Sequence, residues 1–444
     1  MRRGLLLAAM LLPFSACSTT EILSVEDPDI INPGAANSPA GARAVYAGAL
    51  GEFAFAVVGD DGGTEGQILV SGSFTDELIN SETFPTRLEY ELRAIDIKNG
   101  TLLAVFRNLQ RARVLLEAAA RGLEQYSPTP AYRISESFAL AGLAYVYAGE
   151  NYCSGVPFSN PFPAVTYGTP QTTVQVFTTA IERFDSALAH PDTGAIAATI
   201  LNLARVGKGR ALLNRGGSGD DAAAVAAVAA VPLAFVYQTT HTVTTARQRN
   251  GIFAFTWQNE RFSVADAEGG NGLNFRTAGD PRVQSVRDPI GAGVGFDNST
   301  PQWNPLKFPS RTVPTPIATG IEAKLIIAEV LLRAGNATWI DTLNFVRANG
   351  GVAGLAPLMD PGTPTARQDL LFRERAFWMY LSGHRLGDLR RLMRQYGRTE
   401  DAVFPTGVHF KGTPYGDDVN LPVPFDELNN PNLPGPTTCI DRLP

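Results

Sequence analysis

Apolar residues recur at helical spacing over several long segments of the chain. Ser38 followed by a proline supplies a typical start for the first segment. The predicted helices cover residues 38–58, 99–123, 131–149, 173–189, 195–214, 220–231, 320–334 and 338–348. Alanine and glycine alternate with aromatic residues on their apolar faces, which permits close contact between neighbours. The pattern predicts a mainly α fold in which paired helices stack as in a tetratricopeptide-like repeat scaffold.

Residues 369–396 combine a helical apolar pattern with a dense group of charges and contain no proline. We predict one long helix there, bent at Gly383. Arg385 and Asp388 fall on or beside its apolar faces. Because inward-facing charges need partners, we expect them to pair with each other or with neighbouring groups.

Two regions lack any helical period. Residues 59–85 are rich in glycine and acidic residues and are predicted to form a loop. Residues 235–316 are rich in Thr, Gly, Asn, Pro and aromatic residues, which predicts mostly loop with a few short strands. Long irregular segments in a helical scaffold usually serve binding. We therefore expect a helical domain over residues 38–444 with a loop-rich, ligand-binding insertion at about 235–316.

The N-terminus has the pattern of an export signal. Met1-Arg2-Arg3 precedes an apolar run from Leu5 to Leu12, and the small residues Ser15-Ala16 precede Cys17. Residues 1–16 are therefore predicted to be a signal peptide, and the polar, proline-bearing residues 17–37 an extended tether. The apolar run is too short to span a bilayer, and we expect no later segment to do so.

Two of the three cysteines, Cys153 and Cys439, follow the signal and its boundary cysteine. An exported chain enters a compartment where thiols become oxidised. They can therefore form a disulfide bond or remain two free thiols.

The sequence lacks the residues that several classes of enzyme and binding protein require. The four histidines are isolated from one another and from cysteine along the sequence, so no metal-ligand spacing is present. No G-x-S-x-G elbow or phosphate-binding loop occurs, and the net charge of −6 argues against nucleic acid as a partner. We expect no cofactor and no catalysis, although glycoside hydrolysis needs only two facing carboxylates. The best candidates for such carboxylates are Asp60, Asp61, Glu65, Asp76 and Glu77.

Three motifs carry a resemblance to a known family: the charged segments Gly383-His384-Arg385 and Asp388-Leu389-Arg390-Arg391, and the tail Leu421-Pro422-Val423-Pro424. In this order they resemble the SusD/RagB family of outer-membrane nutrient-binding lipoproteins. The resemblance implies an α-α superhelix without enzymatic activity, a SusC-like TonB-dependent receptor as partner, and an oligosaccharide or peptide nutrient as ligand. The residues before Cys17 also resemble the bacterial lipobox, which implies that Cys17 is lipidated and anchors the protein at the cell surface in the outer membrane. An ordinary cleaved signal peptide is the alternative.

Aromatic rings stack on sugar faces, and polar side chains bind hydroxyl groups. The expected ligand-binding residues are Trp257, Trp303, Phe262 and Tyr90 for stacking, with Asp76, Arg87 and Asn259 for hydrogen bonding. The alternatives are a lipid-anchored helical scaffold that binds another envelope protein, and a glycoside hydrolase.

Overall fold

The computed structural model describes residues 37–444 except 163, 290 and 434. The predicted signal peptide, nearly all of the tether, and the lipidation site Cys17 lie outside the described residues.

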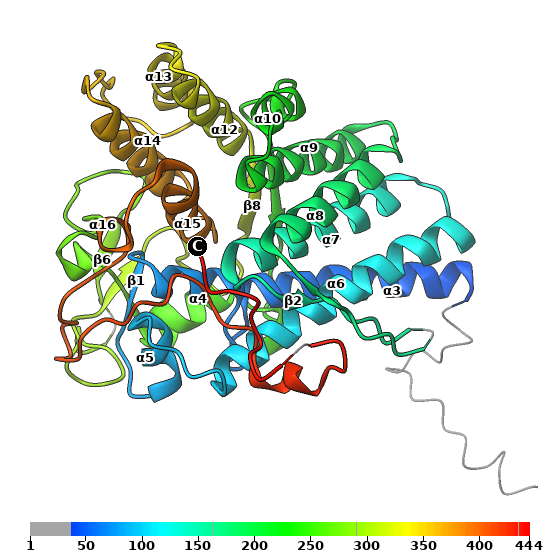
Figure 1. The fold of residues 1–444 in the computed structure, drawn as a ribbon, viewed down its shortest axis with the longest axis horizontal. Coiled ribbons are helices and arrows are strands. Elements are labelled where there is room, and N and C mark those ends of the chain that lie inside the picture. Colours follow the sequence, from blue (N-terminus) through cyan, green and yellow to red (C-terminus); the bar gives the residue numbers. More distant parts are fainter. Residues whose placement is uncertain (1–36, 163, 290, 434) are drawn as a thin grey trace, which may run out of the picture.

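Helices of the first half lie side by side in one layered stack (Figure 1). They are α3 (Pro39–Val58), α6 (Gly100–Tyr126), α7 (Tyr132–Asn151), α8 (Thr173–Leu188), α9 (Ala195–Arg215) and α10 (Asp220–Val228). Consecutive helices from α6 to α10 pack against each other, and α3 packs along α6. This arrangement confirms the predicted mainly α, helical-repeat scaffold.

Glycines allow the close helix contacts that the sequence suggested. A Cβ atom on Gly142 of α7 or Gly207 of α9 would lie 2.8 or 2.3 Å from the ring of Phe184 on α8. Neither position has room for a side chain. The ring of Phe184 therefore holds three helices together.

Helices of the second half follow the irregular region and pack back on this stack. They are α12 (Gly320–Arg333), α13 (Trp339–Asn349), α14 (Pro364–Trp378), α15 (Arg385–Tyr396) and the short α16 (Glu400–Val403). The prediction of one continuous helix over residues 369–396 is wrong, because α14 ends at Trp378 and α15 begins at Arg385. Between them, Leu381 and Gly383 have left-handed backbone angles, with φ of 45° and 73°.

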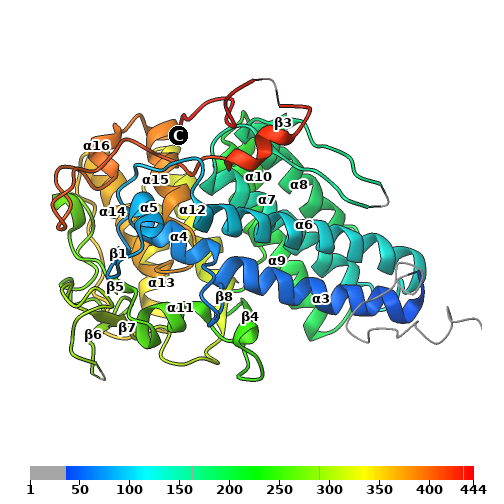
Figure 2. The same cartoon turned by 90° about the horizontal axis from the view of Figure 1, so that it is seen from below.

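The predicted loop at residues 59–85 contains buried structure. It includes α4 (Gln67–Phe74), in which every residue is buried, and β1 (Leu78–Asn80). A helix that is buried on all sides shows no amphipathic period, so the pattern could not reveal it. Figure 2 shows α4 between α3 and the second-half helix α15, and it contacts both. α5 (Pro85–Glu91) follows it.

Residues 235–316 are largely irregular with short strands, as expected. All strand pairs are antiparallel: β1 with β5 (Phe262–Val264), β2 (Val156–Pro157) with β3 (Pro170–Gln171), β4 (Val236–Thr239) with β8 (Thr315–Thr319), and β6 (Ser285–Arg287) with β7 (Trp303–Pro305). Short helical turns interrupt this region: η1 (Ala246–Gln248), α11 (Gly251–Phe253), η2 (Ala254–Gln258) and η3 (Glu268–Gly270), with η4 (Phe425–Asn429) in the tail.

One helix after the signal peptide has the length and composition of a membrane span, although none was expected from the sequence. By length and apolar composition α3 could cross a membrane. In the structure it lies along α6 (Figure 2), and buried side chains such as Phe53 and Val57 belong to the core. Core helices of folded domains often have the same length and composition, so this feature does not indicate a membrane span.

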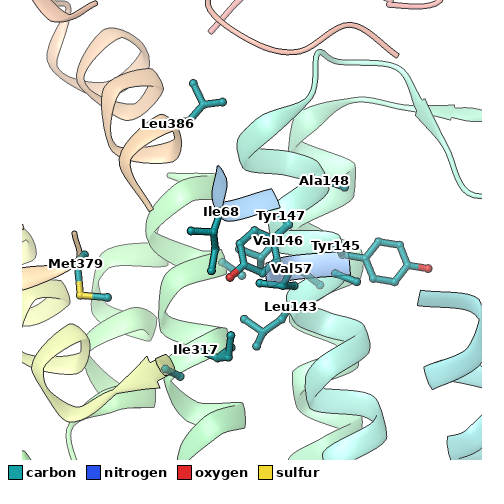
Figure 3. Close-up of a cluster of buried hydrophobic side chains, with 14 of the residues drawn as sticks. Val57, Ile68, Leu143, Tyr145, Val146, Tyr147, Ala148, Ile317, Met379 and Leu386 are labelled. Carbon is teal, nitrogen blue, oxygen red and sulfur yellow. The ribbon is translucent and has the colours of Figure 1, made fainter. Parts of the chain in front are cut away.

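A continuous core joins the two halves. Figure 3 shows Ile68 of α4 beside Tyr147 of α7, with Leu143 below them and Leu386 of α15 above. These side chains belong to one buried cluster. The C-terminal helices are therefore packed through α4 onto the repeat stack.

A disulfide bond joins Cys153 to Cys439, with their Cα atoms 5.9 Å apart. Of the two states that the sequence left open, the structure contains the paired one. Backbone bridges of Tyr152 to Leu421 and of Ser154 to Asp441 continue the contact. The tail is thus fastened to the chain just after α7.

Buried charges of α15 form a network with other helices. Arg385 pairs with Asp76 (2.6 Å), while Asp388 pairs with Arg375 (2.8 Å) and Arg391 (2.7 Å). The expectation that Arg385 and Asp388 have charged partners is confirmed, although they do not pair with each other. Burial raises the pKa of Asp388, but the two guanidinium groups outweigh burial and hold that pKa well below its usual value.

Arg390 of α15 caps a helix end instead of pairing with a carboxylate. Its guanidinium donates to the carbonyl oxygens of Gly149 (2.9 Å), Glu150 (2.7 Å) and Tyr152 (3.0 Å) at the end of α7. Burial lowers the pKa of this arginine. The contact satisfies carbonyl groups that a helix end leaves without intrahelical partners.

We expect Asp388→Asn to lower the free energy of unfolding by about 3–5 kcal/mol, because it leaves the two buried arginines Arg375 and Arg391 to share the single carboxylate of Glu329. Urea unfolding at neutral pH measures this loss. The matched control is Asp369→Asn, which removes a carboxylate that pairs with Arg398 and is 56% exposed. An exposed pair contributes about 1 kcal/mol or less.

The stability lost in Asp388→Asn should depend on pH. The pKa of Asp388 is lowered on folding, so its contribution is complete above the unfolded aspartate pKa of about 3.9 and is lost as the pH falls below it. The stability gap between wild type and Asp388→Asn should therefore narrow with acidification below that pKa. A gap that stays constant down to the acid unfolding of the protein would contradict the assignment.

Candidate functional site

Three phenylalanine rings are exposed where separate loops meet. Phe84, Phe296 and Phe410 are 48%, 48% and 51% exposed. Phe84 directly precedes α5, and Phe296 lies between β6 and β7. Phe410 lies in the segment after α16. Exposed large aromatic rings that gather in one place mark binding surfaces.

Two cations connect these rings. The guanidinium of Arg261 lies 5.1 Å from the ring centroid of Phe84 and 4.4 Å from that of Phe296. The ammonium of Lys411 lies 5.7 Å from the centroid of Phe410 and 3.0 Å from a carboxylate oxygen of Asp297, the residue after Phe296. We call these five residues, Phe84, Phe296, Phe410, Arg261 and Lys411, the aromatic platform.

Backbone hydrogen bonds hold the platform segments in register. The amide of Ser81 donates to the carbonyl of Arg261, and its own carbonyl accepts from Asp297, both at 3.0 Å. The amide of Phe296 donates to the carbonyl of Glu260 at 2.9 Å. The pairing of β1 with β5 places these strand ends side by side. The rings therefore project from a connected framework.

Carboxylates beneath the platform neutralise its cations. Glu82 is buried and pairs with both Arg261 and Arg87. Hydrogen bonds from Thr300 and from the amide of Ser299 help to lower the pKa of Asp297 well below its usual value, despite the opposing effect of burial. The platform combines apolar ring faces with a balanced set of charged groups.

Three of the seven predicted ligand residues, Trp257, Trp303 and Asn259, are partly accessible. Trp257 is half-buried, its indole N–H donates to the carbonyl of Pro305 (3.0 Å), and its ring stacks on Phe253. Trp303 is half-buried beside Arg276 and Arg287, whose guanidinium groups lie 5.0 and 5.9 Å from its ring. Asn259 is partly exposed next to Glu260. Ligand contact by these three residues remains a prediction.

The remaining predicted residues point inward, which corrects their assignment. Tyr90 and Phe262 are completely buried, so neither presents a ring face to a ligand. Asp76 is completely buried and engaged by Arg385. Arg87 is 6% exposed and pairs with Glu65 and Glu82. Its guanidinium lies 5.1 Å from the ring of Phe84, so it supports the platform from below.

The sequence reasoning missed the platform residues. The dipeptide Phe84-Pro85 and the segment Gly295-Phe296-Asp297-Asn298 are aromatic positions beside turn-forming residues, and this signal could have marked them as exposed. Phe410 lies in a similar setting, between Gly407 and Gly412.

The acids of residues 60–77 have structural partners. Asp60 accepts from the amides of Gly62 and Thr64, at 2.9 and 3.0 Å. The other contacts are Asp61 with Arg249, Glu65 with Arg87, Asp76 with Arg385, and Glu77 with the amide of Leu381. Burial raises the pKa of Glu77 to about 8. These carboxylates stabilise the fold and do not line either cavity described below.

One buried group resembles a nucleophile with its base. The hydroxyl of Ser382 lies 2.9 Å from Nδ1 of His384, and Nε2 of His384 lies 3.0 Å from Oε1 of Glu322. These residues are only 3%, 2% and 1% exposed. The hydroxyl also donates to the carbonyl of Met379. A substrate has no access to this group, so its role is to brace the turn between α14 and α15.

Two cavities open elsewhere. A cavity of about 380 Å³ lies between α6 and residues 157–162 and includes Val114, Leu115 and Phe162 in its lining. Another of about 340 Å³ lies between α3 and residues 240–248. Neither is lined by a platform residue or by a ligand residue predicted from the sequence.

No protein-family model matches the sequence, and no curated protein matches it. Solved structures do match the fold. A SusD superfamily protein from Parabacteroides distasonis has a TM-score of 0.65 and 14% identity, over 89% of this chain and 98% of that chain. A SusD-like carbohydrate binding protein from Bacteroides vulgatus has a TM-score of 0.62 and 14% identity, over 89% and 97%.

A third match is the surface glycan-binding protein A from Bacteroides thetaiotaomicron, with a TM-score of 0.61 and 12% identity over 88% of this chain and 97% of that chain. These similarities extend over nearly the whole length of each solved chain. The protein therefore belongs to the structural class of helical-repeat proteins, and within it the chain has the SusD-like fold.

We expect Trp303→Ala to lower the free energy of unfolding by about 2 kcal/mol, roughly half of the 3–5 kcal/mol for a fully buried tryptophan, because this ring is half-buried against the core. Urea unfolding measures the change. Unchanged stability combined with a loss of oligosaccharide binding would instead make Trp303 a ligand contact, as the sequence suggested.

Proposed function

We propose that the protein is a surface lipoprotein that captures an oligosaccharide on the aromatic platform. The observation that carries this proposal is the exposure of Phe84, Phe296 and Phe410 around the polar groups of Arg261 and Lys411. The SusD-like fold supports it, because solved proteins of this fold include a carbohydrate binding protein and a surface glycan-binding protein.

The chemistry of the platform suits a sugar. Each pyranose ring has an apolar face of C–H groups that packs on an aromatic ring, and hydroxyl groups that need hydrogen-bond partners. The guanidinium of Arg261 lies between two of the rings and supplies donors, while the ammonium of Lys411 bonds to Asp297, Asn80 and Glu82 and holds the segments together. Several sugar units of one chain can then contact several rings at once.

Delivery of the ligand is the second part of the proposal. The SusD/RagB resemblance implies that a SusC-like TonB-dependent receptor takes up the captured nutrient. A lipid on Cys17 would hold the folded domain at the outer membrane, with residues 18–37 as the tether. The protein itself performs no bond cleavage in this proposal.

We expect Phe84→Ala and Phe296→Ala each to weaken oligosaccharide binding about tenfold, because each removes one stacking contact of about 1–1.5 kcal/mol. A glycan array with the purified full chain selects the oligosaccharide, and calorimetry with that compound gives the affinities. Phe345→Ala on α13 is the matched control, because Phe345 has the same 48% exposure.

If Phe84→Ala and Phe296→Ala bind the oligosaccharide as tightly as the control Phe345→Ala, the platform is not the binding surface. Thermal unfolding of each variant shows whether the change is confined to binding. Since the rings of Phe84 and Phe296 are about half exposed, we expect small changes in Tm.

We also expect a large β-barrel receptor to co-purify with the tagged protein after gentle detergent extraction from its native envelope, as identified by mass spectrometry. Recovery with other envelope proteins only would favour a scaffold that binds another envelope protein. The cavity beside α6 offers such a scaffold an apolar contact, since the ring of Phe162 at its edge is 57% exposed.

Extraction of the Cys17→Ala variant without detergent tests the lipid anchor.

A further inference from the structure

Two carboxylates and an imidazole meet beneath the aromatic platform. Glu91 lies on α5, Glu268 begins η3, and His409 lies in the segment after α16. Each offers a ligand atom, and these atoms lie within 4.8 Å of one another. Along the sequence His409 is isolated from the other histidines and from cysteine. The fold brings it next to two acids that are far away in the sequence.

The group is buried, and its charges are incompletely matched. Glu91, Glu268 and His409 are 1%, 7% and 2% exposed. Among the described residues, neither the Oε2 atom of Glu91 nor that of Glu268 has a hydrogen-bond partner. A buried carboxylate oxygen without a donor is costly, so two of them in one place indicate a missing positive ligand.

Within the part of the chain that the structure describes, no arginine forms an ion pair with Glu91 or Glu268. Burial and the neighbouring Glu91 raise the pKa of Glu268 well above its usual value, and the guanidinium of Arg93 opposes this only in part. However, its terminal N–H groups donate to the carboxylate of Glu400 (2.8 Å) and to the carbonyl oxygens of Asp418 (2.9 Å) and Pro405 (3.0 Å). They are therefore committed to the segment around the group.

Outer contacts orient each of the three side chains. The hydroxyl of Tyr415 donates to Oε1 of Glu268 (2.6 Å), and the amide of Asn80 donates to Oε1 of Glu91 (2.8 Å). The amide of Lys411 donates to Nδ1 of His409 (3.2 Å). Nε2 of His409 lies 3.0 Å from Oε1 of Glu91. The contacts of Tyr415 and Asn80 with the two carboxylates are of the kind that orients ligands in metal sites, whereas both ring contacts of His409 change on coordination.

We propose that Glu91, Glu268 and His409 bind a divalent metal ion through one imidazole and two carboxylates. This ligand set suits zinc, with manganese as the second choice, because both accept mixed nitrogen and oxygen ligands. Ligands about 2.1 Å from a tetrahedral zinc ion lie roughly 3.4 Å from one another, so modest side-chain movements complete the site.

Protons must move when the metal binds. In the structure Nδ1 of His409 accepts a hydrogen bond, so the ring proton is on Nε2, facing Glu91. Coordination through Nε2 transfers this proton to Nδ1 and opens the 3.2 Å contact with the amide of Lys411. Any proton held by a carboxylate is released to solvent. Metal–nitrogen and metal–oxygen bonds form as waters leave the ion, and within the protein only N–H and O–H bonds change.

The site has a structural consequence for the platform. His409 precedes Phe410 and Lys411, two platform residues, in the turn closed by the bridge of Val408 to Pro414. A metal ion would fasten this turn to α5 and η3. This inference does not depend on the ligand of the platform or on its proposed function.

Calorimetry with zinc chloride tests the site in the full chain, purified in detergent and freed of metal with EDTA. We expect saturable binding of one equivalent and a rise in Tm, because the ion binds the folded state only. Glu268→Gln should weaken zinc binding at least ~10-fold, the loss that removal of an outer contact already produces. Glutamine can still accept from Tyr415, so this variant should fold.

Asp417→Asn is the matched control, since it removes an exposed acid of the same segment and should leave zinc affinity unchanged. His409→Gln is the second site variant, in case Glu268→Gln fails to fold. The proposal is overturned if the wild type binds no zinc or manganese saturably at millimolar concentration. It is also overturned if the site variants bind as tightly as the wild type, because the ions would then lie elsewhere on the surface.

Discussion

The buried ion pairs of α15 are the constraint on which the rest of the molecule depends. Charges lose their hydration when they enter the core, and only close opposite charges compensate for that loss. Arg391 pairs with Glu329 of α12, Asp388 with Arg375 of α14, and Arg385 with Asp76 after α4. Each partner comes from a different element. These pairs therefore favour the observed packing of the helices, since an arrangement that separated them would bury charges without partners.

This network also positions the platform. Asp76 lies two residues before β1, and β1 pairs with β5. Ser81 and Arg261, at the ends of these strands, continue into the exposed loops. An interaction in the core thus determines where the strands begin. The exposed rings keep their spacing because their backbone segments are tied to each other and then to the helices.

Long amphipathic helices could be predicted from the sequence, because one buried face leaves a clear period. Residues 100–126 and 132–151 are examples in which the predicted bounds lie within a few positions of the structure. The buried helix α4 has apolar and small residues on all sides, so it has no such period and was predicted to be a loop. The break between α14 and α15 includes Gly383, where a bend was predicted, but it also includes Leu381, a residue that shows no preference for a turn.

The candidate site was harder to predict for a different reason. Loop composition indicated irregular segments, but it cannot tell which of their side chains point outward. Tyr90 and Phe262 are as aromatic as Phe84 and Phe296, yet tertiary contacts bury the first pair and expose the second. The group of Glu91, Glu268 and His409 depends on three segments that only the folded chain brings together.

The disulfide bond gives the chain a particular topology. It joins residues that are 286 positions apart and so closes a covalent ring that contains most of the folded domain. A protease that cuts once at any exposed loop inside this ring leaves the two pieces connected. Under non-reducing conditions the nicked protein would migrate as one species, and only a reductant would separate the fragments. For a protein exposed to secreted proteases, a single cut in a surface loop does not release half of the domain.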